Sequence, residues 1–119
     1  DMNLEKQADF VATVTGTDVK KDQTTIHCIT NMESYGRVRF SVTLEIAGDR
    51  SGGAAYGSGR GAMKDGTFFA GEFYGVWSRE GTKVTIRYVD RVTDGTQNVY
   101  EGVFDATEDE IHFEQYRFA

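Results

Sequence analysis

The chain has 119 residues, a formal net charge of -6 at pH 7 and a sequence pI near 4.8. This length allows one domain with its own hydrophobic core and is too short for two. The acidic balance predicts no nucleic-acid partner, because phosphate-binding faces need a basic stripe, and no apolar run approaches the roughly 20 residues of a membrane span.

The first half of the chain predicts a polar start followed by strands. Residues 1–7 are polar and predict a frayed end or a short helix. Four strands are expected after them, at residues 8–17, 24–30, 37–46 and 54–63. The third strand has the clearest pattern, because every second residue is apolar, as is typical of a half-buried antiparallel strand: Val38, Phe40, Val42, Leu44 and Ile46.

Three similar turns divide the second half at nearly equal spacing. They are Asp65-Gly66, Glu80-Gly81 and Asp94-Gly95, each followed by threonine. An acidic residue followed by glycine supplies the positive φ that a tight hairpin loop needs. The turns and a later loop therefore predict four more strands, at residues 67–78, 83–92, 97–105 and 110–118.

Eight strands of about ten residues, joined mostly by short hairpins, form one all-β domain. We expect an eight-stranded antiparallel up-and-down meander closed into a barrel, whose interior is filled by side chains or holds one small ligand. The absence of proline supports long strands without interruption. A two-sheet β-sandwich or jelly roll is the alternative.

The glycine and histidine patterns predict neither a phosphate-binding loop nor a metal site. Gly57, Gly59 and Gly61 alternate along one strand, but a phosphate-binding loop would lead into a helix, and a hairpin follows here. Their period predicts either strong coiling at a barrel corner or close packing against the aromatic residues of the next strand. The two histidines, His27 and His112, do not make a metal site with the single cysteine, and no cofactor motif is present.

Large aromatic residues gather on one face of a predicted strand. Phe69, Phe73 and Trp77 recur at every fourth residue, separated by Gly71 and Gly75. Such rings form either an ordinary core or the wall of a cavity for an apolar ligand. If they line a cavity, Tyr88 and Tyr116 would complete the ligand-binding set.

A register with two-residue hairpin loops brings polar residues to the same face. It places Trp77 opposite Val84, Phe73 opposite Tyr88 and Tyr88 opposite Glu101, so that Asp90 and Glu101 share an apolar face. Buried charges need partners and often mark functional sites. Three-residue loops with a glycine bulge are the open alternative, and a shift of one residue would move Glu101 to the other face. Extended across the neighbouring hairpins, the two-residue register adds Arg60, His112, Glu114 and Tyr116.

In number and length of strands, nearly the whole chain resembles small ligand-holding β-barrels. These are the calycins, such as lipocalins and fatty-acid-binding proteins, and the allene oxide cyclase-like barrels. The resemblance implies a ligand held inside the barrel. It carries no catalytic residue over to this sequence.

Three functions follow as hypotheses. The first is non-enzymatic binding of a small, largely apolar molecule in the barrel, without a cofactor. The second is a cofactor-free isomerase or cyclase, in which Asp90 or Glu101 is the general acid or base, Arg60 or Tyr88 stabilises negative charge, and His112 belongs to the same site. The third is a protein-interaction module on an outer sheet face, with these residues: Arg39, Arg87, Arg91, Tyr74 and Tyr100.

The remaining expectations concern the thiol, the compartment and assembly. Cys28 is the only cysteine, so no intramolecular disulfide forms, and we expect a small buried hydrophobe. Cytoplasmic localisation is favoured, with a secreted or processed form as the alternative. A homodimer is also open.

Overall fold

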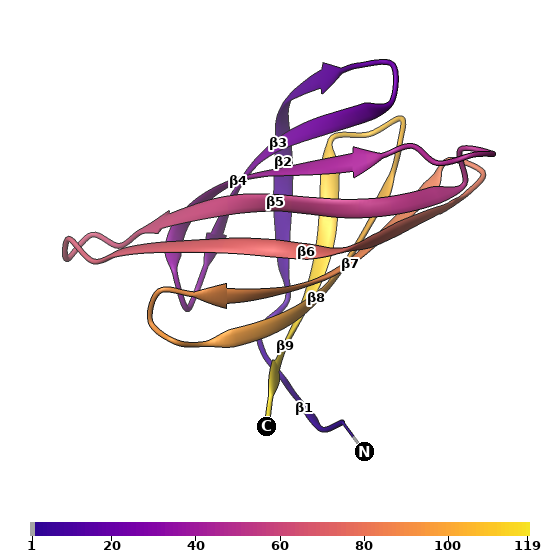
Figure 1. Cartoon of the computed structure of the whole chain (residues 1–119). Coiled ribbons are helices and arrows are strands. Elements are labelled where there is room, and N and C mark those ends of the chain that lie inside the picture. Colours follow the sequence, from indigo (N-terminus) through magenta and orange to yellow (C-terminus); the bar gives the residue numbers. More distant parts are fainter. Residues whose placement is uncertain (1) are drawn as a thin grey trace.

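The computed structural model describes residues 2–119 as a closed antiparallel barrel (Figure 1). Within these residues there is no helix, so none that could cross a membrane. The all-β barrel predicted from the sequence is confirmed. Its strands are β1 (Leu4–Lys6), β2 (Phe10–Val19), β3 (Gln23–Met32), β4 (Gly36–Glu45), β5 (Gly52–Ala62), β6 (Phe68–Glu80), β7 (Lys83–Val92), β8 (Gln97–Asp105) and β9 (Glu110–Phe118).

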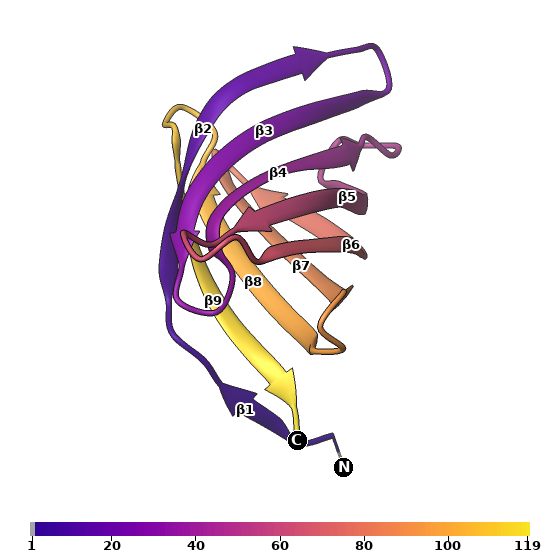
Figure 2. The ribbon, with the colours of Figure 1, turned by 90° about the vertical axis from the view of Figure 1, so that its left-hand side faces the viewer.

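The barrel closes through β9. Each strand from β2 to β8 pairs with the next in the chain, and β9 pairs with both β8 and β2. Figure 2 shows the strands curving around one interior. A closed sheet leaves no long strand edge unpaired, which removes the main route by which β-proteins aggregate.

The start of the chain differs from its prediction. Instead of a frayed end or a helix, residues 4–6 form β1, which pairs with the end of β9, and the Gln7 amide donates to the Gln115 carbonyl at 2.8 Å. The polar composition of this segment concealed the strand, because all three side chains of β1 are exposed. Asp1 lies outside the described residues.

All three turns lie where they were predicted, but two of them have one more residue than the two-residue register assumed. Gly66 and Gly95 have φ of 93° and 90°, and each closes a three-residue loop with a glycine bulge. The preceding aspartate accepts the backbone N–H of the following threonine, at 2.9 Å for Asp65 and 3.0 Å for Asp94. Of these three turns, only the one between β6 and β7 has a two-residue loop, Gly81 and Thr82.

These loops decide which face each side chain occupies. Between β6 and β7 the register differs by two residues from the prediction, so Trp77 pairs with Ile86, and the inward faces are unchanged. Between β7 and β8 it differs by one, so Asp90 pairs with Asn98 and Glu101 pairs with Arg87. The predicted shared face of Asp90 and Glu101 is therefore wrong, because one extra loop residue exchanges the two faces of β8.

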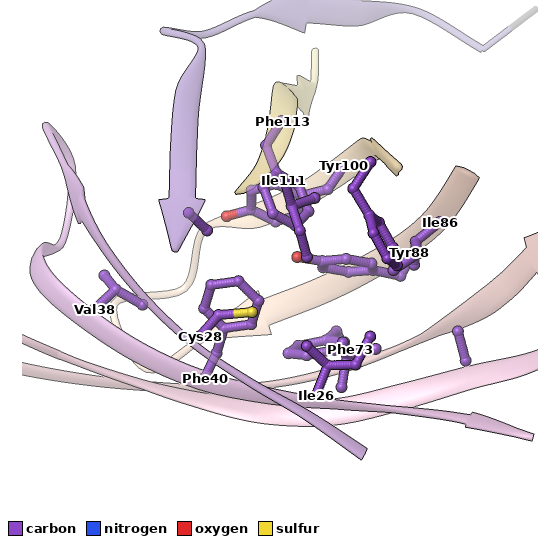
Figure 3. Packing of buried hydrophobic residues seen from close by; sticks show 14 of the residues in the cluster. Ile26, Cys28, Val38, Phe40, Phe73, Ile86, Tyr88, Tyr100, Ile111 and Phe113 are labelled. Atoms are coloured by element: carbon purple, nitrogen blue, oxygen red, sulfur yellow. The ribbon is translucent and has the colours of Figure 1, made fainter. Parts of the chain in front are cut away.

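Aromatic rings fill much of the interior (Figure 3). Tyr88 stacks between Phe73 and Tyr100, with centroid distances of 4.3 and 5.0 Å. Gly57 allows this packing, since a Cβ there would lie 2.7 Å from Phe73 Cζ and 1.9 Å from the Ser41 carbonyl oxygen. The expected packing of alternate glycines under the rings is confirmed at this position. Cys28 is buried, and desolvation raises its pKa to about 12, so it is a hydrophobe as predicted.

Candidate functional site

One end of the barrel contains a polar cluster, which we define as Tyr35, Asp90, Thr96, Asn98, Gln115 and Arg117. Asn98 is its centre and is fully buried. Its side-chain amide donates to Asp90 Oδ1 and to the Tyr35 hydroxyl, both at 2.9 Å. Its Oδ1 accepts from Gln115 Nε2 at 2.9 Å and from Arg117 Nε at 3.2 Å. The network joins β7, β8 and β9 and fixes the orientation of the Asp90 carboxyl group.

Tyr35 connects the polar cluster to the opposite wall. It lies in the loop between β3 and β4, and its hydroxyl is 2.5 Å from Thr96 Oγ1 and 3.4 Å from Arg117 Nη2. Its ring meets Phe69 edge-to-face at a centroid distance of 5.2 Å. The loop thereby covers part of this end of the barrel.

A small cavity adjoins the polar cluster. Its volume is about 50 Å³, it opens at the barrel end, and rings and aliphatic side chains form most of its wall. Among the described residues, Asp90 is the one carboxylate in that wall. The lining residues are Phe10, Met32, Tyr35, Val38, Phe40, Gly59, Arg60, Gly61, Phe69, Ala70, Gly71, Phe73, Tyr88, Asp90, Val92 and Tyr100.

Burial controls the acidity of the groups around this cavity. It raises the pKa of Asp90 to about 6, against the opposing effect of hydrogen bonds from Asn98. Burial, followed by the Asp90 charge, raises the pKa values of Tyr88 and Tyr100, so both phenols stay protonated at neutral pH. The site thus presents a carboxylate that titrates near neutrality beside neutral hydroxyl groups.

The other predicted catalytic residues lie outside the barrel. Glu101 forms an ion pair with Arg87 at 2.7 Å on the outer face. His112 and Glu114 pair with Val103 and Glu101, as the predicted β8–β9 register required, but this face is also external. Arg60 borders the cavity, but it pairs with Arg39 on the outward row of β4 and β5, and its exposed side chain donates from Nη1 to the Gly59 carbonyl at 2.7 Å. The structure therefore does not bring the side chains of these residues into contact with Asp90.

The predicted ligand-binding residues divide between three places. Phe69, Phe73 and Tyr88 line the cavity beside Asp90. Trp77 lies at the opposite end, where its Nε1 donates to the Glu45 carbonyl at 2.8 Å and its ring borders an open apolar depression of about 250 Å³. Tyr116 lies on the outer face and donates to Glu114 Oε2 at 3.0 Å.

The predicted interaction face is also divided. Tyr74 is exposed on the outside of β6, as that hypothesis required, but Tyr100 is buried in the interior. Arg87 is held by Glu101. The proposed set of outer residues is therefore incomplete.

An external hydrogen-bonded chain was not expected from the sequence. His27 Nδ1 is 2.6 Å from Ser41 Oγ, and its Nε2 is 2.7 Å from Asp18 Oδ2. The side chains of His27 and Asp18 are 40% and 68% exposed, so water screens their interaction. We assign no catalytic role to it. Among residues 2–119, no group of three or more His, Cys, Asp or Glu side chains could hold a metal ion.

Comparison with known proteins adds no family to this geometry. The chain matches no protein-family model, no curated protein and no solved structure. The fold and the candidate site therefore rest on the residues themselves.

Proposed function

We propose that the protein binds a small, largely apolar molecule at the Asp90 end of the barrel. The observation that carries the proposal is a ring-lined cavity that ends at one oriented, half-buried carboxylate. Small-molecule sites combine an apolar wall with a few convergent polar groups in this way. A closed eight-stranded meander is also the architecture of lipocalin-like barrels that hold one small ligand.

The volume of the cavity limits how the ligand enters. Sites for drug-sized ligands are roughly 300–1,000 Å³, whereas this cavity is about 50 Å³ and admits only a few water-sized groups. We therefore expect one end of the ligand to enter beside Asp90. Its apolar body would remain in the open mouth, against Phe69.

Binding is favoured over catalysis by the distribution of the acid-base candidates. Of the predicted acid-base residues, Asp90 is the carboxylate that reaches the interior, while Glu101 and His112 face outward. An isomerase or cyclase would retain Asp90 as its base and Tyr88 as its neutral donor. It would lack the second carboxylate and the cation on which the predicted mechanism depended.

The test is titration with benzyl alcohol, followed by amide NMR. We expect shifts at Gly71, Tyr88 and Val92, with little change at Trp77 and Val84. Shifts confined to Trp77 and Val84 would move the ligand to the depression at the other end. The absence of saturable shifts at either end would refute the proposed function.

A glycine pair supplies the matched control. A methyl group at Gly71 would lie 3.5 Å from Val92 Cγ2 and 3.7 Å from Asp90 Oδ2, so Gly71→Ala fills the cavity without a clash. A methyl group at Gly16 meets only His27 Cδ2, at 3.8 Å, outside the cavity. We expect Gly71→Ala to weaken benzyl alcohol binding about fivefold or more, and Gly16→Ala to leave it unchanged.

A further inference from the structure

We propose that the group entering the cavity is a protonated primary amine, bound by the carboxylate of Asp90. This inference rests on the proposed function, because it names the chemical class of the same ligand. The ligand would then combine an apolar body with a short cationic head. Four features of the site support an amine.

The first feature is a free acceptor. Within residues 2–119, Asn98 is the residue that donates to the Asp90 carboxylate: its side-chain amide reaches Oδ1, and its backbone N–H also contributes. Oδ2 lies beside Gly71 in the cavity wall, where the missing side chain leaves space. A donor on the ligand would therefore meet Oδ2 without displacing a bond of the network.

The second feature is the charge itself. The polar cluster does not require it, because the amide oxygen of an asparagine could accept the same bond from Asn98. Burying a carboxylate among rings costs free energy unless an opposite charge compensates it. A cationic ligand supplies that compensation, whereas an alcohol donates a hydrogen bond to the carboxylate and leaves its charge uncompensated.

The third feature is the position of Arg117, the cation of the polar cluster. Arg117 bonds to Asn98 Oδ1 at 3.2 Å and to the Tyr35 hydroxyl at 3.4 Å. The ion pairs among the described residues do not include Asp90. Arg117 thus supports the network through Asn98 and Tyr35. The cation that borders the cavity, Arg60, has an exposed side chain that bonds to the Gly59 carbonyl, so neither arginine forms an ion pair with Asp90 among the described residues.

The fourth feature is size. A volume of about 50 Å³ holds an ammonium group and one or two methylenes, but little more. The apolar wall also lowers the local dielectric constant, which strengthens attraction between an ammonium and the carboxylate. A short-armed amine with an apolar body in the mouth satisfies both conditions.

The experiment compares benzylamine with benzyl alcohol, which have the same body and differ in the head. At pH 7.5 we expect the wild-type protein to bind benzylamine at least about tenfold more tightly, measured by the NMR shifts of Gly71, Tyr88 and Val92. Asp90→Asn should weaken benzylamine binding by about tenfold or more and benzyl alcohol binding by a smaller factor, so that the preference for the amine is lost. This substitution retains an oxygen for Asn98, so the network persists.

The control removes a carboxylate elsewhere. Because the protein carries a net charge of -6, a cation could gather at its surface without entering the cavity. Glu101→Gln removes one outer negative charge and should leave the preference for benzylamine unchanged. Equal reductions in Asp90→Asn and Glu101→Gln would overturn the inference.

The outcomes separate the two proposals. If both probes bind at Gly71 with equal affinity, or if Asp90→Asn retains the preference, the amine inference is wrong and the binding function stands. If neither probe binds, the binding function fails and the amine inference fails with it.

Discussion

Both ends of the barrel bury aromatic rings, but only one of them, among the described residues, also buries an ionisable side chain. At one end, Trp77 donates its indole N–H to the Glu45 carbonyl, and its neighbours are mostly aliphatic and aromatic, while the two carboxylates there, Glu108 and Asp109, are exposed. At the other end, Asp90 retains an ionisable group beside Tyr88 and Tyr100. The first end is explained by packing alone. The second contains a charge that packing does not require, which is why we place the function there.

The largest expected effect tests the structural end. Trp77→Ala removes a buried ring and should lower the free energy of unfolding by about 3–5 kcal/mol, measured by urea denaturation. Benzylamine binding at the Asp90 end should change little in the fraction that remains folded. Loss of binding in folded protein would show that the two ends are not independent.

The second prediction tests whether Asp90 is retained at a cost to stability. Burial raises its pKa from an ordinary 3.8 to about 6, which corresponds to at most about 3 kcal/mol of destabilisation of the charged form. We expect Asp90→Asn to increase the free energy of unfolding at pH 7 by about 1–3 kcal/mol. Such a variant would be more stable and bind less well.

The pH dependence of this effect has a definite sign. Between about pH 4 and 6 the folded protein holds a proton on Asp90 that the unfolded chain has released, so this group destabilises the fold increasingly as pH rises. The difference between Asp90→Asn and wild type should therefore be small at pH 4 and reach its maximum above pH 6. A difference that is the same at both pH values would contradict the raised pKa.

Much of the fold could be predicted from local sequence. The bounds of β7, β8 and β9 agree with the predicted ranges, because each strand ends at a turn or loop with a clear composition. Phe73 and Tyr88 were predicted to share an apolar face, from the spacing of rings and glycines in one strand and the hairpin that joins it to the next. These features depend on residues close together in the chain.

The face of β8 could not be predicted in the same way. Val99 and Val103 are apolar on its outer side, while Asn98 is polar and fully buried on its inner side. Alternation alone therefore favours neither face. A better signal was in the turns, since Asp-Gly-Thr gives a three-residue loop twice, whereas Glu-Gly-Thr gives the two-residue loop. Asn98 and Tyr35 were missed because their partners lie on other strands.

The smallest expected effect compares an outer carboxylate with the inner one on the neighbouring strand. Glu101 is paired with Arg87, but their side chains are 37% and 63% exposed, so water and salt screen the attraction. Glu101→Gln should lower the free energy of unfolding by less than about 1 kcal/mol at pH 7, measured by urea denaturation in low and high salt. The same neutralisation should therefore have opposite signs at the two positions, destabilising at Glu101 and stabilising at Asp90. A stabilising Glu101→Gln would indicate that net negative charge, and not the burial of one carboxylate, dominates the response.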